Sequence, residues 1–153
     1  MTLAQPETQI KVEPLLLEVA DVVNTTLDLD TTLRRVAELV RKVIDYEIFA
    51  ILLVNEKNQD LRIRFSLGYP SDIAEKTRIK LGEGITGMAA QQGEAILVGD
   101  VEKHGAYIPG ISNVRSELAV PLIIKNRVIG VIDIESPIPD HFTEEHKRLL
   151  TLI

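Results

Sequence analysis

Residues 81–100 read LGEGITGMAAQQGEAILVGD, and this stretch decides which fold the chain adopts. It contains a literal G-x-G-x-x-G, formed by Gly82, Gly84 and Gly87. A dinucleotide-binding turn has this spacing, and Asp100 stands near the place of a ribose-binding acid. Such a turn also needs a buried parallel strand before it and a long helix after it. The preceding residues EKTRIK are polar, and Gly93 ends the helical pattern early. We therefore predict a tight turn and a short helix over residues 85–92, and we do not expect NAD to bind there.

The residues before the glycines predict a hairpin. Residues 48–55 form a β-branched apolar run, which is typical of a central strand, and residues 56–59 form a polar turn. Residues 61–67 then alternate, which predicts four apolar side chains on one face: Leu61, Ile63, Phe65 and Leu67. A dinucleotide fingerprint opens its domain, whereas this one follows two paired strands.

The composition limits the classes of function. The chain has 153 residues, a formal net charge of -6 and 45% hydrophobic residues, which is typical of one globular domain. The acidic balance argues against nucleic acid as a partner. The absence of cysteine excludes disulfides, thiolate metal sites, thiol catalysis and a bilin thioether. No apolar run spans a bilayer and no signal peptide begins the chain, so we expect a cytoplasmic protein with no membrane partner.

Two helices are expected before the first strand. Residues 10–27 are apolar on more than one side, which predicts contact with a second surface as well as with the domain itself. The next helix would begin with Asp30 as its N-cap, and capping is a better explanation of Asp28 and Asp30 than a metal site. One buried stripe follows the helical spacing: Leu33, Val36, Ala37, Val40, Val43 and Ile44.

The second half of the chain predicts further strands. Residues 95–98 form a short strand, and residues 100–113 form a loop rich in glycine and proline. Residues 116–124 and 127–135 would pair around a tight turn at Lys125 and Asn126, with Pro121 at an edge or a bulge. Thr143 would cap a last helix, whose pattern runs to Ile153 without a C-cap. We expect this helix to be truncated and to continue in a longer protein.

Three blocks occur in order at a characteristic spacing: KLGEGITGMAAQQGEAILVGDV, RSELAVPLIIKNRVIGVIDIES and HFTEEHKRLLTLI. Together they resemble the signature blocks of GAF domains, and the resemblance covers residues 27–153. It implies an α+β fold, GAF-like (profilin-like and PAS-related), with a six-stranded antiparallel sheet. The N-terminal and C-terminal helices would cover one face and a ligand pocket the other. The whole chain, 1–153, would be a single domain in which residues 1–26 form a signalling and dimerisation helix.

The resemblance implies a non-catalytic, small-molecule-sensing regulatory domain of a bacterial signal-transduction protein. The pocket signal would pass through the terminal helices of a homodimer to an output domain in the same chain. No G-x-S-x-G, H-E-x-x-H or P-loop motif occurs, so we expect no catalytic residue, no metal ligand set and no enzyme. The alternative is a structural dimerisation module with an empty pocket. Relatives that reduce free methionine sulfoxide need cysteines, so the resemblance does not extend to their activity.

Asp133 is the principal candidate for contact with a ligand. It alternates with apolar residues along its strand and would share a face with Ile129, Val131 and Glu135. This face of the strand either forms the floor of the pocket or is exposed to water. In nucleotide-binding GAF domains an acid at the position matching Asp133 touches the ligand. The same resemblance places these residues in the hypothetical pocket: Ala50, Phe65, Ser66, Ile85, Thr86, Tyr107, Val114, Val131 and Asp133. Cyclic-nucleotide-binding members carry Asn-Lys where this chain has Ser136-Pro137, so cyclic nucleotide binding is not expected, and the cofactor stays unknown.

Overall fold

The computed structural model describes residues 12–25, 28–105 and 113–153. The elements follow in chain order: α1 Val12–Thr25, α2 Leu29–Arg41, β1 Ile48–Asn55, β2 Asp60–Leu67, α3 Ser71–Lys76, β3 Arg78–Lys80, α4 Gly84–Gln92, β4 Ile96–Val98, the 3-10 helix η1 Val101–Lys103, β5 Ser116–Ile124, β6 Arg127–Ser136 and α5 Glu144–Thr151. None of the helices described is long and apolar enough to cross a bilayer.

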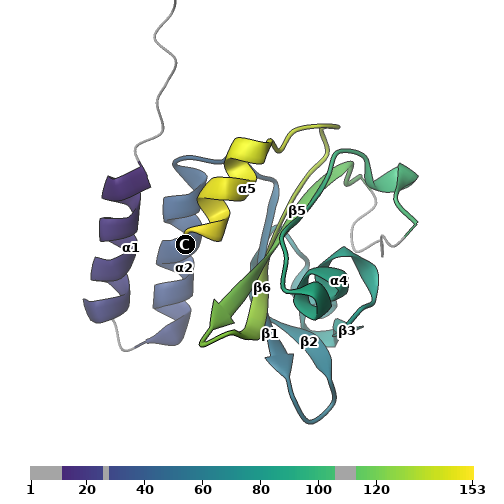
Figure 1. Cartoon of the computed structure of the whole chain (residues 1–153), viewed down its shortest axis with the longest axis horizontal. Coiled ribbons are helices and arrows are strands. Elements are labelled where there is room, and N and C mark those ends of the chain that lie inside the picture. The colour runs from purple at the N-terminus through teal and green to yellow at the C-terminus, as the bar shows by residue number, and fades with distance from the viewer. Residues whose placement is uncertain (1–11, 26–27, 106–112) are drawn as a thin grey trace, which may run out of the picture.

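The six strands form one antiparallel sheet in the order β3-β2-β1-β6-β5-β4. Helices α2 and α5 cover one face, and α4 lies on the opposite face (Figure 1). The predicted α+β class is therefore confirmed. The N-terminal helix was expected to cover a face of the sheet. Helix α1 instead packs on α2 as an outer layer, with Leu15 buried against Leu39.

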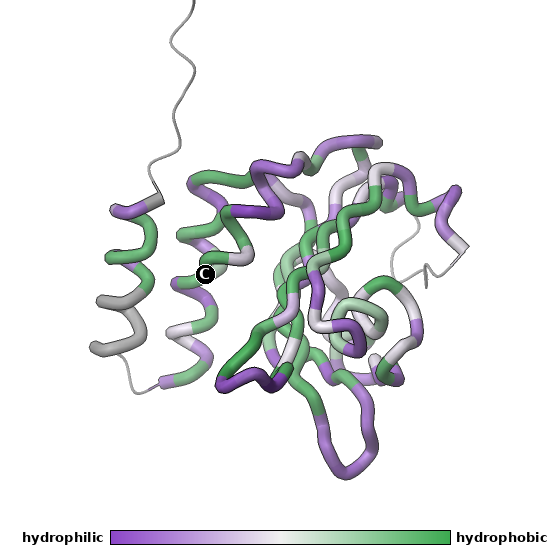
Figure 2. The backbone as a smooth tube through the Cα atoms, in the orientation of Figure 1, coloured by the Kyte–Doolittle hydropathy of each residue, from purple (hydrophilic) through white to green (hydrophobic). Residues whose placement is uncertain are grey.

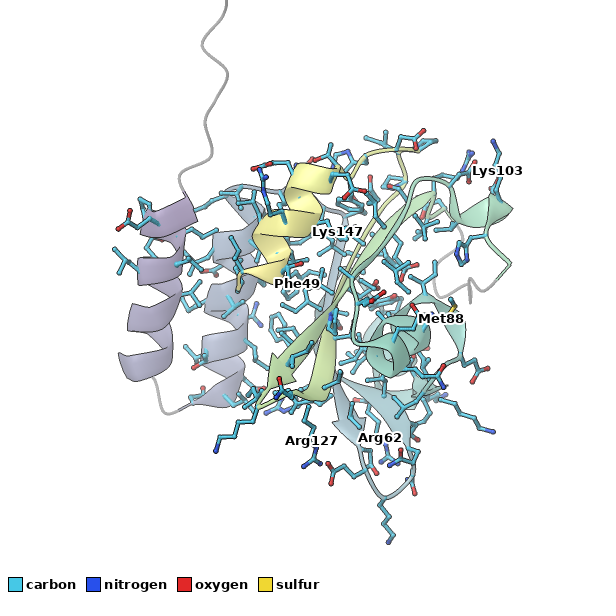
Figure 3. All side chains as sticks on the ribbon, in the orientation of Figure 1. Phe49, Arg62, Met88, Lys103, Arg127 and Lys147 are labelled. Atoms are coloured by element: carbon cyan, nitrogen blue, oxygen red, sulfur yellow. The ribbon has the colours of Figure 1, made fainter. Side chains whose placement is uncertain are left out.

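The sheet separates two apolar cores. Toward α2 and α5, the side chains of Phe49, Ile132 and Ile134 pack with Val40 and Leu150, and all five are almost fully buried. Each such side chain contributes roughly 1.5–3 kcal/mol by leaving water. The central strands are mostly hydrophobic, whereas the tip of the β1–β2 hairpin is hydrophilic (Figure 2). Figure 3 shows Phe49 beside the helical layer and Met88 on α4, beyond the sheet.

The N-terminus of α2 corrects one prediction. Asp28, not Asp30, is the N-cap residue, and its side chain accepts a hydrogen bond from the Asp30 backbone N–H at 3.2 Å. Thr31 also donates its hydroxyl to the Asp28 carboxylate at 2.6 Å. The helix begins two residues earlier than expected because this carboxylate satisfies its first free donors.

A bulge in β2 changes the predicted pattern of faces. Ile51 pairs with Phe65 and Leu52 pairs with Ile63, so Arg64 is left as the extra residue. Ile63 therefore faces α4, whereas Phe65 faces α2 and lies beneath the Arg34 guanidinium, 5.4 Å from the ring centre. The prediction of one apolar face from 61 to 67 is wrong. Arg64 itself forms an ion pair with Asp30.

The β5–β6 hairpin contains a second bulge. Lys125 and Asn126 have φ of 51° and 63°, which confirms the predicted tight turn. Ile123 pairs with Val128 but Leu122 pairs with Gly130, so Ile129 is the extra residue. Val128 packs on the α4 side and Ile129 borders a groove beside α5. Ile129 therefore does not share a face with Asp133, contrary to the prediction from strict alternation.

Candidate functional site

A cavity of about 500 Å³ lies on the α4 side of the sheet. Its size falls within the range of small-molecule sites. Strands β1, β2, β5 and β6 supply the floor, α3 and β3 one wall, and the first turn of α4 another. The residues that line it are Ala50, Leu52, Ile63, Tyr69, Ile73, Lys76, Thr77, Arg78, Ile79, Glu83, Gly84, Ile85, Thr86, Glu117, Asp133 and Glu135.

Three buried carboxyl groups meet on the floor of this cavity. Glu117 on β5 is the direct cross-strand partner of Glu135 on β6, and Asp133 lies two residues before Glu135 on the same face. One carboxylate oxygen from each lies within 4.8 Å of the other two. Their side chains are 2–3% exposed, although carboxylates are seldom buried without a partner. We call these three residues the acid triad.

The acid triad has unused hydrogen-bonding capacity. Within the described part of the chain, neither Oε2 of Glu117 nor Oδ1 of Asp133 has a hydrogen-bond partner. The same residues form no ion pair with any described lysine or arginine. A buried polar atom without a partner costs roughly 1–3 kcal/mol, so these oxygens point to a group that approaches them from the cavity.

The burial of the acid triad favours the protonated carboxyls. Burial raises the pKa of Glu117 to about 8, and the charge of Glu135 acts in the same direction, whereas the contact with Asp133 lowers the pKa. Burial also raises the pKa of Asp133, with the neighbouring Glu117 charge second. The pKa of Glu135 is raised by burial and then by the charge of Asp133. A cation that enters the cavity would therefore have to displace these protons.

Tyr69, which follows β2, positions one member of the triad. Its hydroxyl donates a hydrogen bond to Oε2 of Glu135 at 2.9 Å. Burial raises the pKa of Tyr69 far above its usual value, and the charges of Asp133 and Glu135 raise it further. Tyr69 is thus a fixed hydrogen-bond donor to Glu135, whereas Oε2 of Glu117 and Oδ1 of Asp133 have no partner among the described residues.

The opposite wall carries donors and positive charge. Lys76 and Arg78 line the cavity from α3 and β3. The first turn of α4, beginning at Gly84, also lines it, and its N-cap residue Glu83 makes no side-chain capping hydrogen bond. Helix N-termini carry partial positive charge and free N–H groups. The cavity is therefore lined by three acids at its floor and, at this wall, by Lys76, Arg78 and the acid Glu83 beside the N-terminus of α4.

The glycine-rich turn builds that wall. Gly82 and Gly84 have φ of 87° and 66°, which side chains rarely adopt. Strand β3 is a short edge strand antiparallel to β2, and α4 has nine residues. This arrangement lacks the buried parallel strand and long helix of a dinucleotide-binding turn. Asp100 instead caps η1 and forms an ion pair with Arg115 at 3.1 Å.

The structure separates the predicted pocket residues into groups. Ala50, Ile85, Thr86 and Asp133 line the cavity. Val114 and Val131 are buried in the apolar cluster on the same side without lining it. Ser66 pairs with Ala50 on that side but is not a lining residue. Tyr107 lies outside the described residues.

Phe65 is a correction, because the bulge at Arg64 turns its ring into the core beneath α2. The sequence interpretation also missed Glu117 and Tyr69, which both line the cavity. Glu117 was detectable as an acid inside an otherwise apolar strand, SELAVPLII. Tyr69 follows a glycine after β2 and carried no signal of its own.

Comparison with known proteins gives two kinds of relative. A free methionine-R-sulfoxide reductase of Escherichia coli (strain K12) is 34% identical over 71 residues, 46% of this chain and 43% of that protein. A Nif-specific regulatory protein of Herbaspirillum seropedicae is 23% identical over 145 residues, 89% of this chain and 27% of that protein. The chain spans about half the length, or less, of the curated relatives it matches.

A solved structure matches almost the whole chain. It is the free methionine-R-sulfoxide reductase from Neisseria meningitidis in complex with its substrate, with a TM-score of 0.83 and 26% identity. The match covers 99% of this chain and 88% of that one. The expectation of a non-catalytic sensor, and of no enzyme, is therefore wrong, because the relatives and structural neighbours include reductases. It rested on the absence of cysteine and of the G-x-S-x-G, H-E-x-x-H and P-loop motifs.

The family follows from a match over most of the sequence. Residues 26–153 match the family model of the GAF domain. This range includes every described strand of the sheet and all three members of the acid triad. Both the reductase and the regulatory protein match this same region of the chain in part or in full. The chain belongs to the GAF domain family.

Proposed function

We propose that the acidic cavity binds a small free amino acid as a substrate, with methionine-R-sulfoxide as the first candidate. The observation that carries the proposal is the pair of buried, unpartnered oxygens on Glu117 and Asp133. An ammonium group has three N–H donors and one positive charge. It would donate to both oxygens and to Glu135, and hydrogen bonds between charged groups are the strong ones.

The rest of an amino acid also fits the cavity. Its carboxylate would lie toward Lys76, Arg78 and the first turn of α4, which supply positive charge and backbone donors. Between the two ends, Leu52, Ile63 and Ile79 offer an apolar surface for a thioether-like side chain. The cavity thus offers oxygen acceptors to an ammonium group at its floor, and Lys76, Arg78 and the N–H groups of α4 to a carboxylate at its wall.

The relatives narrow the class of amino acid. Proteins named for free methionine-R-sulfoxide occur among both the curated relatives and the solved structures. Reduction of a sulfoxide to a thioether takes up two electrons and two protons and releases water. This sequence has no cysteine, so a dithiol outside it would supply the two electrons and two protons and become a disulfide. The residues of the cavity would bind and orient the sulfoxide for that exchange.

Calorimetric titration in the presence of EDTA tests binding. We expect saturable binding of L-methionine-R-sulfoxide, with weaker binding of the S epimer, and loss of most of the affinity in Glu117→Gln and Asp133→Asn. Glu94→Gln is the matched control, since Glu94 is an exposed acid outside the cavity. Incubation with dithiothreitol and chromatography of the product then measure turnover. Equal affinity in the wild type and both triad variants would remove the triad from the site.

A further inference from the structure

We infer that the acid triad is also a binding site for one calcium-sized divalent cation. The amino-acid proposal concerns a ligand with N–H donors, whereas this inference concerns a bare ion and does not rest on that proposal. The two ligands would use the same oxygens, so each should exclude the other. Carboxylate oxygens are the ligands that hard cations such as Ca²⁺ prefer.

The spacing of the oxygens fits one ion. Glu117, Asp133 and Glu135 each bring one oxygen within 4.8 Å of the others. Oxygens bound to one Ca²⁺ ion at about 2.3–2.6 Å can lie up to roughly 4.6–5.2 Å apart, whereas the limit for Mg²⁺ at about 2.0–2.1 Å is roughly 4.2 Å. The triad can hold Ca²⁺ with small movements, and Mg²⁺ would require a tighter approach of the two strands.

The unpartnered oxygens are an independent sign of a ligand. Glu117 is 3% exposed and Asp133 is 2% exposed, yet Oε2 of the first and Oδ1 of the second have no partner among the described residues. None of the ion pairs among the described residues includes a member of the acid triad. A divalent ion would bind both free oxygens and offset the mutual repulsion of the carboxylates.

The cavity completes the coordination. Calcium takes six to eight oxygens, and the triad supplies three to six of them depending on how many carboxylates bind through both oxygens. The cavity of about 500 Å³ next to the triad has room for water as the remaining ligands. Lys76 and Arg78 line the far wall with exposed side chains, and Arg78 donates to the backbone oxygens of Glu75 and Thr77.

Tyrosine-sensitised terbium luminescence gives a local test, because Tb³⁺ binds at calcium sites and emits when a nearby tyrosine is excited. The chain has no tryptophan and three tyrosines, and Tyr69 is bonded to Glu135 of the triad. We expect terbium emission from the wild-type protein, competition by Ca²⁺, and weaker competition by Mg²⁺. Tyr69→Phe should weaken the emission, because it removes the tyrosine that is hydrogen-bonded to Glu135. Tyr46→Phe should keep the emission, since Tyr46 lies in the core on the other side of the sheet.

The double variant Glu117→Gln/Asp133→Asn should lose Ca²⁺ binding, while Glu94→Gln should retain it. Absence of calcium binding to wild type at millimolar Ca²⁺ would overturn the inference, as would unchanged binding in a folded double variant. If the double variant does not fold, unchanged calcium affinity in the folded single variant Glu117→Gln would overturn it instead. Amino-acid binding in EDTA and calcium binding without amino acid are separate titrations, so failure of one proposal is distinguishable from failure of the other.

Discussion

Glu117 and Glu135 face each other directly across strands β5 and β6, and both side chains enter the same cavity. Like charges in this position destabilise a sheet. In this pair, Glu135 receives a hydrogen bond from Tyr69, while Oε2 of Glu117 has no partner within the described residues. The arrangement is unfavourable for the isolated fold and favourable for a cation or a donor that enters the cavity, which makes the pair a better sign of binding than of stability.

The acid triad should make the ligand-free protein less stable at high pH. The folded-state pKa of Glu117 is about 8, against an ordinary value of 4.5, so the folded protein holds this proton more tightly than the unfolded chain. Stability should therefore fall as the pH rises from about 4.5 through 8. We expect Glu117→Gln to remove part of this fall, so that its stability relative to wild type increases with pH.

Urea unfolding at several pH values in EDTA measures that difference. Glu94→Gln serves as the control, because an exposed acid should leave the pH dependence as it is in wild type. A pH dependence that is identical in Glu117→Gln and wild type would contradict the prediction.

Gly87→Ala should disrupt the packing of α4 against the end of β3. A Cβ atom at Gly87 would lie 2.5 Å from the backbone oxygen of Lys80, so the helix or the preceding strand must move. We expect a loss of about 1–3 kcal/mol in the free energy of unfolding, together with weaker ligand binding. Gly105→Ala is the matched control, since nothing lies within 4 Å of a Cβ atom there. Equal stability of the two variants would show that the α4 contact is not tight.

Neighbouring positions on β2 should have different effects on ligand binding. Ile63 lines the cavity, and Phe65 packs beneath α2. Ile63→Val should reduce affinity for methionine sulfoxide by up to about fourfold, which corresponds to roughly 0.8 kcal/mol for one buried methylene. Phe65→Leu should reduce stability by about 0.5–3 kcal/mol and leave affinity unchanged. Calorimetry and thermal unfolding separate the two effects, and the reverse pattern would contradict the assignment of faces.

The start of α5 should weaken in acid. The Thr143 backbone N–H donates to Nδ1 of His146 at 3.2 Å, and the His146 N–H donates to the Thr143 hydroxyl. Burial lowers the pKa of His146, with the charge of His141 second, so the folded state favours the neutral ring. The stability that this cap supplies is present above the ordinary pKa of 6.5 and is lost as the pH falls. His146→Gln should keep the cap and remove this loss, which hydrogen exchange of the α5 amides would detect.

Helix α1 should hold two copies of the chain together. Leu17 on α1 is 65% exposed although Leu15 of the same helix is buried on α2, so an apolar side chain is left for a second contact. We predict a homodimer through the terminal helices, as the two-sided apolar pattern of residues 10–27 first suggested. Light scattering should give twice the chain mass, and Leu17→Glu should give a monomer. A monomeric wild type at high micromolar concentration would contradict this.

The sheet was predictable from sequence because its signals are local. The apolar run of β1, the Lys125-Asn126 turn and the Thr143 cap each depend on a few adjacent residues, and all three are confirmed. The pairing of α1 with α2 was less accessible, because an apolar helix face does not identify the surface that it contacts.

The site was harder to predict because of the two bulges. Counting outward from the Lys125-Asn126 turn pairs Glu117 with Ile134, on the other face from Glu135. The extra residue Ile129 shifts the pairing by one and brings both acids to the same side. Arg64 has the same effect on β2, where it sends Phe65 away from the cavity. A bulge has no strong sequence signature. The strands could therefore be predicted from the sequence, but the face of the sheet on which each side chain lies could not.

The alternation along β6 also has a consequence for how the chain folds. Ile132 and Ile134 enter the helical core, while Asp133 and Glu135 face the cavity. If β6 paired one residue out of register, two carboxyls would enter the apolar layer and two isoleucines would enter the cavity, so the slipped sheet would be strongly disfavoured. Asp133 and Glu135 therefore also select the correct strand pairing during folding. Replacing them with apolar residues would remove that selection, and misregistered, aggregation-prone chains would be expected among the products of refolding.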